Sequence, residues 1–193
     1  MNHQDAEVYY YHFVGDTLRD GRPVPPDGEW LEHVGPLIPC EAGLHASEHP
    51  FDAMRNAPGA TLCLVELDGE IIPHGNPVDK VVARRRRIVR RIDATHLLRR
   101  FAADQALSVA HLWDIPPVVR EYLTTLDESK RTAARLAARE AAGSAAWLAA
   151  GSAMRDAAWE AAWLAAWEAA REAARDGFRR RVENEFRSPP RPV

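Results

Sequence analysis

Cysteine, histidine and acidic side chains gather in the stretch PCEAGLHASEHPFDAM, residues 39–54. Thiolate and imidazole groups are the ligands that zinc prefers. The residues that carry them are Cys40, His45 and His49, with Cys63 or His74 further along the chain. Their C-x4-H-x3-H spacing matches no paired zinc pattern. Pro50 also suits the first turn of a helix, so the two preceding histidines do not share a helix face. We therefore expect no metal site.

Nucleophilic and nucleotide-binding motifs are also absent from the sequence. Ser47 lies outside any G-x-S-x-G elbow. The chain has neither a G-x-x-x-x-G-K-S/T loop nor a G-x-G-x-x-G turn, which argues against NTPases and Rossmann dinucleotide enzymes. Cys40 with a remote histidine remains open as a nucleophilic arrangement, although no further motif supports it.

A strongly basic block follows an acidic segment. Residues 1–79 carry 14 acids and 3 arginines, whereas residues 80–100 carry Lys80 and eight arginines with Asp93 as the single acid. The block could bind phosphates or nucleic acid through Arg84, Arg85, Arg86, Arg87, Arg90 and Arg91. No aromatic residues interleave with these arginines for base stacking. The simpler interpretation is that the block neutralises the acidic segment before it.

The elements that position these residues predict an α+β fold, with a small, twisted, mostly antiparallel sheet. Aromatic and β-branched runs predict strands, and Pro and Gly predict loops. The expected strands are 7–14, 43–47 and 60–67, a loop covers 19–39, and Asp68-Gly69 signals a hairpin or bulge. Residues 81–92 fit either a helix or a strand, and their β-branched content favours a strand.

Helix signals follow the strands. Ser47 is the expected N-cap of a short helix with Pro50 in its first turn and Asp52 near its positive end. Asp93 or Thr95 caps a second helix. Further along, residues 108–114 suit a short strand, and Pro116-Pro117 opens another helix.

From Ala133 to Asp176 the chain repeats an Ala-Ala-x-x tetrad eleven times, with bends expected at Gly143-Ser144 and Gly151-Ser152. Alanine is the best helix former, so this tail should be helical. A period of four overshoots the helical 3.6, which predicts a slanted tryptophan stripe. The tryptophans are Trp147, Trp159, Trp163 and Trp167. The tail is either a solvated low-complexity helix or an interface for self-association or a protein partner.

These patterns predict an α+β domain over 1–125, an alanine-rich helical tail over 126–187 and a disordered end over 188–193. No leader precedes residue 30, and no uncharged apolar run is long enough to span a membrane. Two cysteines are too few for a disulfide scaffold. We therefore expect a soluble cytoplasmic protein without membrane contact.

The order YYYH, LRDG, GLHAS, GATLCLVELDG, NPVDK and RIVRRID resembles a family of uncharacterised phage and bacterial proteins. Members carry a Gly-Leu/Phe-His signature, a Val-Glu-x-x-Gly strand and an Arg-rich or Lys-rich strand. Many also end in Ala-Ala-Arg and Ala-Ala-Trp repeats. This resemblance covers nearly the whole chain and implies no biochemical activity.

The same order is distantly similar to small ADP-ribosyltransferases of the rifampin-modifying type. That resemblance implies NAD as a cofactor and places His12 at the ribose, His45 near the ring that stacks on nicotinamide, and Asp79 near the acid that stabilises positive charge. Each has a structural alternative: His12 as a core histidine, His45 as a hydrogen-bond partner of the preceding loop, and Asp79 as a turn residue.

Two functional hypotheses follow. The first is a binding or interaction module of phage or mobile-element origin, assembled through its tail. The second is an NAD-dependent ADP-ribosyltransferase-like enzyme using His12, His45 and Asp79. Whether the protein is an enzyme stays open at this stage, and nucleic-acid binding ranks behind both hypotheses.

Overall fold

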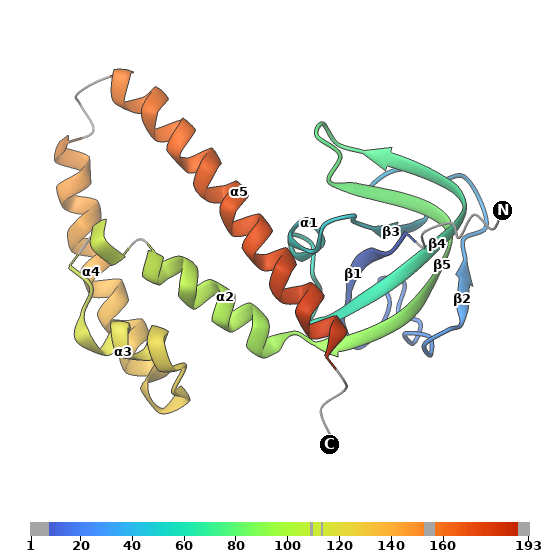
Figure 1. Cartoon of the computed structure of the whole chain (residues 1–193), viewed down its shortest axis with the longest axis horizontal. Helices are drawn as coiled ribbons and strands as arrows, with labels where there is room; N and C mark the ends of the chain where they lie inside the picture. The colour runs from blue at the N-terminus through green and yellow to red at the C-terminus, as the bar shows by residue number, and fades with distance from the viewer. Residues whose placement is uncertain (1–7, 109, 113, 153–156, 189–193) are drawn as a thin grey trace. The chain divides into compact units, whose positions relative to one another are not determined.

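The computed structural model describes residues 8–108, 110–112, 114–152 and 157–188. The expected α+β class is confirmed (Figure 1). The strands are β1 (Tyr10–Val14), β2 (Trp30–Glu32), β3 (Leu44–Ala46), β4 (Thr61–His74) and β5 (Lys80–Asp93). The helices are α1 (Pro50–Met54), α2 (Thr95–Ser108), α3 (Pro117–Thr125), α4 (Arg131–Ser152) and α5 (Ala157–Arg187). Two 3₁₀ turns, η1 (Ala110–Leu112) and η2 (Glu128–Lys130), lie between the helices.

The chain divides into two compact units. Unit 1 runs up to Thr95 and resumes at Gly177, and unit 2 comprises the residues between them, His96 to Asp176. Unit 2 is thus inserted between two segments of unit 1. The sequence predicts a boundary near residue 125, which lies inside unit 2. The return of the chain to unit 1 at Gly177 leaves no local signal in the sequence. Within the described residues, no helix is long and apolar enough to cross a membrane.

A long hairpin of β4 and β5 organises unit 1. The antiparallel sheet has the order β1-β4-β5-β2, and β3 also pairs with β5. Two register shifts, at Leu64/Val65 and between Asp68 and Ile71, interrupt the hairpin. Such bulges bend strands, and Figure 1 shows both strands strongly curved. The bulge expected at Asp68-Gly69 and the strand expected at 81–92 are therefore both confirmed.

The curved sheet closes on itself at a point that the sequence did not reveal. Ser47, which directly follows β3, bridges to Tyr11 in β1 through two backbone hydrogen bonds of 2.8 and 2.9 Å. The strands β1, β4, β5 and β3 therefore form a closed ring. Ring closure removes exposed strand edges and gives the sheet an interior.

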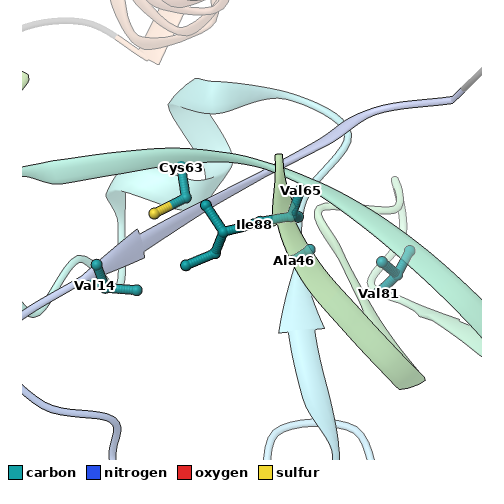
Figure 2. Close-up of a cluster of buried hydrophobic side chains, with 6 residues drawn as sticks. All are labelled: Val14, Ala46, Cys63, Val65, Val81 and Ile88. Atoms are coloured by element: carbon teal, nitrogen blue, oxygen red, sulfur yellow. The ribbon is translucent and has the colours of Figure 1, made fainter. Parts of the chain in front are cut away.

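The interior of the closed ring contains an apolar cluster. One cluster of buried side chains draws on all four ring strands: Val14, Ala46, Cys63, Val65, Val81 and Ile88 (Figure 2). Burying a Val or Ile side chain contributes about 1.5–3 kcal/mol. The apolar and β-branched content of β4 and β5 is what predicted these strands.

The last turns of α5 pack on other side chains of unit 1. Phe178, Val182 and Phe186 are all buried. The Phe178 ring lies 6.3 Å from that of Phe51, and the Phe186 ring lies 6.4 Å from that of Tyr11. The C-terminal segment of α5 is thus part of the core of unit 1.

Unit 2 has a small core of its own, formed by Ala110, Ile115, Val119 and Ala134. The prediction of helix for the tetrad repeat is confirmed over the described parts of α4 and α5. No break occurs at Gly143-Ser144, whereas α4 ends at Ser152. Residues 189–193, expected to be disordered, lie outside the described residues.

Two local predictions were wrong. The short strand expected at 108–114 is replaced by the 3₁₀ turn η1 in its described part. His49, and not Ser47, is the N-cap of α1, and its Nδ1 accepts a hydrogen bond of 3.1 Å from the Phe51 amide. Ser47 is extended instead, because its backbone closes the ring. Pro50 and Asp52 lie in the first turn, as expected.

Candidate functional site

Six arginines of the basic block lie along β5, and four of them pair with acids from preceding segments. Arg84 pairs with Glu70 at 3.2 Å, Arg87 with Glu66 at 2.5 Å, Arg91 with Asp27 at 2.5 Å, and Arg85 with Asp68. Arg90 instead donates to the carbonyl oxygens of Phe186 and Ser188 at the end of α5. These contacts support the interpretation that the block neutralises the acidic segment.

An aromatic residue does accompany two of the arginines. The guanidinium groups of Arg85 and Arg87 lie 4.8 and 4.9 Å from the centre of the Trp30 ring. Trp30 stands opposite Arg87 in the pairing of β2 with β5. Because this pairing joins residues far apart in the sequence, inspection of the arginine run alone missed it.

Arg86 is the exception in the block, because it points into the closed ring. Arg86 pairs with Leu67 and lies two residues from Ile88. Ile88 belongs to the interior cluster, and Leu67 packs against it. Residues that are paired or two apart share a sheet face. Only 5% of Arg86 is exposed.

The guanidinium of Arg86 is poorly compensated. It donates from Nη1 to the carbonyl oxygen of His45, while its Nε has no hydrogen-bond partner in the described part of the chain. No described carboxylate forms an ion pair with it. Burial lowers its pKa to about 10, so the group stays positively charged at neutral pH. Burying an unpaired cation costs several kcal/mol.

Two histidines neighbour this cation. His12 pairs with Cys63, which places it on the interior face of β1. Burial lowers the pKa of His12 well below its usual value, and the charge of Arg86 and then His45 add to the effect. Burial, followed by the charge of Arg86, also lowers the pKa of His45. Both rings are therefore neutral at pH 7. Arg86, His12 and the carbonyl of His45 together form what we call the Arg86 site.

The ring of His45 has a separate role. Its Nε2 accepts a hydrogen bond of 3.0 Å from the Cys40 amide, so the ring holds the loop before β3. This matches the structural alternative considered for His45. The same residue therefore contacts the loop with its side chain and Arg86 with its backbone.

Asp79, the third residue of the ADP-ribosyltransferase hypothesis, lies in the turn between β4 and β5. Its carboxylate pairs with Arg55 at 3.3 Å, and its amide donates to the His74 carbonyl at 3.1 Å. No contact among the described residues joins Asp79 to His12 or His45. The structure thus places both histidines near Arg86, and Asp79 with Arg55.

Near this turn, Cys40 contacts His74, which the sequence offered as a further ligand beside it, and Lys80, which the sequence did not connect with it. Its sulfur lies 3.5 Å from His74 Nε2 and 3.5 Å from Lys80 Nζ. Among the described residues, no group of three or more His, Cys, Asp or Glu side chains is placed to hold a metal ion.

The four tryptophans proposed as an interface lie on α4 and α5, but their side chains fall outside the described part of the structure.

Comparison with known proteins locates a recognised domain in this chain. Residues 8–100 match the family model of DUF7666, a domain of unknown function. The match covers the five strands and ends within α2. No curated protein and no solved structure matches the chain. The matched segment contains every residue of the Arg86 site, and it excludes the end of α5 that completes the core of unit 1.

Proposed function

We propose that unit 1 is a binding module whose closed ring holds the anionic group of a small ligand at Arg86. The observation that carries this proposal is a buried guanidinium that has no carboxylate partner among the described residues. A structural arginine in an apolar core is normally paired, because an uncompensated charge is expensive to bury. An anionic ligand would supply the missing counter-charge.

The geometry of the guanidinium suggests the class of anion. Nη1 is occupied by the His45 carbonyl, which leaves the edge formed by Nε and Nη2. Two parallel N–H groups on one edge match the two oxygens of a carboxylate or a phosphate. His12 adds a neutral polar ring, and the remaining surroundings are the aliphatic cluster. The ligand should therefore combine one carboxylate or phosphate group with a compact apolar body.

The alternative function is an NAD-dependent ADP-ribosyltransferase-like enzyme. The observation in its favour is that the pKa values of His12 and His45 are both lowered by the charge of Arg86, a cation that could face the NAD pyrophosphate. The pairing of Asp79 with Arg55 favours simple binding over this chemistry.

The wider role that we propose is that of a phage or mobile-element accessory protein. In this role the sheet domain recognises a ligand, and the tryptophan-bearing helices of unit 2 self-associate or bind a protein partner. Tryptophans are efficient interface anchors, which supports an assembly function for these helices.

The test is thermal denaturation of the full chain with inorganic phosphate, benzoate, nicotinamide or NAD at about 10 mM. A ligand that binds only the folded state raises its stability. We expect phosphate or benzoate to raise the Tm of the wild type and of Arg85→Met, a half-buried control from the same strand, and to leave the Tm of Arg86→Met unchanged. Without ligand, Arg86→Met should be at least as stable as the wild type, because it removes a buried charge.

Two results would overturn the proposal. One is an equal anion-dependent shift in Arg86→Met and the wild type. The other is a ligand-free Arg86→Met protein that is strongly destabilised, which would make Arg86 a structural link to β3. A shift with NAD that exceeds the shifts with phosphate and nicotinamide and disappears in His12→Ala would instead favour the enzyme.

A further inference from the structure

Three side chains from separate segments meet at the far end of the β4–β5 hairpin. Cys40 comes from the loop before β3, His74 ends β4 and Lys80 begins β5. The Cys40 sulfur is within 3.5 Å of both the imidazole Nε2 and the ammonium Nζ. We call these three residues the thiol cluster. None of them belongs to the Arg86 site.

The loop that carries Cys40 is tightly specified. Ile38 and Ala42 bridge across it, with hydrogen bonds of 2.8 and 2.9 Å. Cys40 itself has a φ of 70°, a left-handed conformation that few non-glycine residues adopt. Gly43 lets the loop approach β5 closely, because a Cβ at this position would lie 2.3 Å from Val82 Cγ2. The backbone of the Cys40 loop is therefore closely specified on both sides of this residue.

The charge of Lys80 is directed at the Cys40 sulfur and at no described acid. Among the described residues, no carboxylate pairs with its ammonium, and its only side-chain hydrogen bond is to the Cys40 sulfur. The neighbouring acid, Asp79, pairs with Arg55 instead. A cation aimed at a sulfur, with an imidazole on the same sulfur, is the environment in which cysteines act as nucleophiles.

We propose that Cys40 is a reactive thiol that exchanges with small anionic disulfides, of the glutathione type. In the exchange His74 takes the proton of the Cys40 thiol, and the sulfur attacks one sulfur of the disulfide. A Cys40–ligand disulfide forms, and the other half of the ligand leaves as its thiolate. No further oxidant is needed, because the ligand disulfide is reduced as Cys40 is oxidised. Lys80 attracts the negative charge of the incoming ligand.

The second cysteine provides an internal control. Cys63 has no exposed surface and lies in the interior cluster of the closed ring. Burial raises the pKa of its thiol to about 11. Cys40, by contrast, is exposed. One protein molecule thus carries a thiol in a polar cationic setting and a thiol in an apolar one.

The experiment measures mixed-disulfide formation with glutathione disulfide by mass spectrometry of the native full chain. We expect one modification, at Cys40, at a rate at least about tenfold above that of a peptide covering residues 36–46. The rate should fall about tenfold in Lys80→Met and in His74→Gln, and His74→Gln should also change its pH dependence. Cys63→Ala and Lys130→Met should react like the wild type.

Reaction of Cys40 at the peptide's rate would overturn the proposal, as would unchanged rates in Lys80→Met and His74→Gln. Equal modification of Cys63 under native conditions would show that burial does not separate the two thiols, and would also count against it. Circular dichroism of each variant identifies any variant that fails to fold. If Lys80→Met fails to fold, Lys80→Arg takes its place. Lys80→Arg keeps the positive charge and should keep more than half of the wild-type rate of mixed-disulfide formation.

Discussion

Replacing Phe178 with alanine tests whether the end of α5 belongs to the core of unit 1. The Phe178 side chain has no exposed surface, and its ring packs edge-on against Phe51 at 6.3 Å. Truncating a fully buried phenylalanine to alanine costs about 3–5 kcal/mol, through lost burial and the cavity left behind. Domains of this size are stable by only about 5–15 kcal/mol, so the loss should be large.

Hydrogen exchange on the intact chain, read peptide by peptide, measures this effect. Each 1.4 kcal/mol is a tenfold change in an opening equilibrium, so amides in β1 and β4 should exchange roughly a hundredfold to a few thousandfold faster. Amides in α3, which belongs to unit 2, should be unaffected. Arg180→Ala changes an exposed residue of the same helix and should stay within about 0.5 kcal/mol of the wild type. Unchanged exchange in β1 and β4 of Phe178→Ala would refute the reasoning.

Two further predictions concern single residues of unit 1. Gly43→Ala should destabilise the protein by more than about 1 kcal/mol in urea denaturation, because φ is +120° and Val82 blocks the new methyl group. At Gly21, φ is +83° and no atom lies within 4 Å of an added Cβ, so Gly21→Ala should lose less stability. An equal loss of stability in the two variants would contradict the steric explanation. His12 has a lowered pKa when folded, so it binds protons more readily when unfolded, and wild-type stability should fall as pH drops below about 6.5. Urea denaturation of His12→Asn should show a smaller loss of stability than the wild type when the pH falls from about 7.5 to 5. An equal loss of stability would contradict the attribution of this pH dependence to His12.

The sequence predicted those parts of unit 1 whose determinants are local. The β-branched content of β4 and β5, the hairpin or bulge signal at Asp68-Gly69 and the helix signals at Pro50 and Pro117 all depend on neighbouring residues. The ring closure depends on a backbone bridge between Tyr11 and Ser47. Backbone groups are common to all residues, so neither side chain predicts this bridge. Ser47 was assigned to a helix cap for the same reason.

The candidate sites show the same division. Counting charges indicated that the arginine block pairs with preceding acids, but it treated Arg86 like its neighbours. Strand alternation places Arg86 on the face of Ile88, opposite Arg85 and Arg87, and the pairing with Leu67 within the closed ring makes that face an interior one. The contacts of Cys40 with His74 and Lys80 span more than thirty positions and arise from the shape of one loop. Spacing along the chain carries no information on such contacts.

The insertion of unit 2 has a consequence for how this protein can vary in length. The tetrad repeat, residues 133–176, lies entirely inside the insertion, whereas Phe178, Val182 and Phe186 follow directly after it. Gain or loss of one tetrad changes the length of a helix by about 6 Å and removes no residue of the sheet domain. Any gain or loss of tetrads is thus confined to a part of the chain that lies outside the sheet domain.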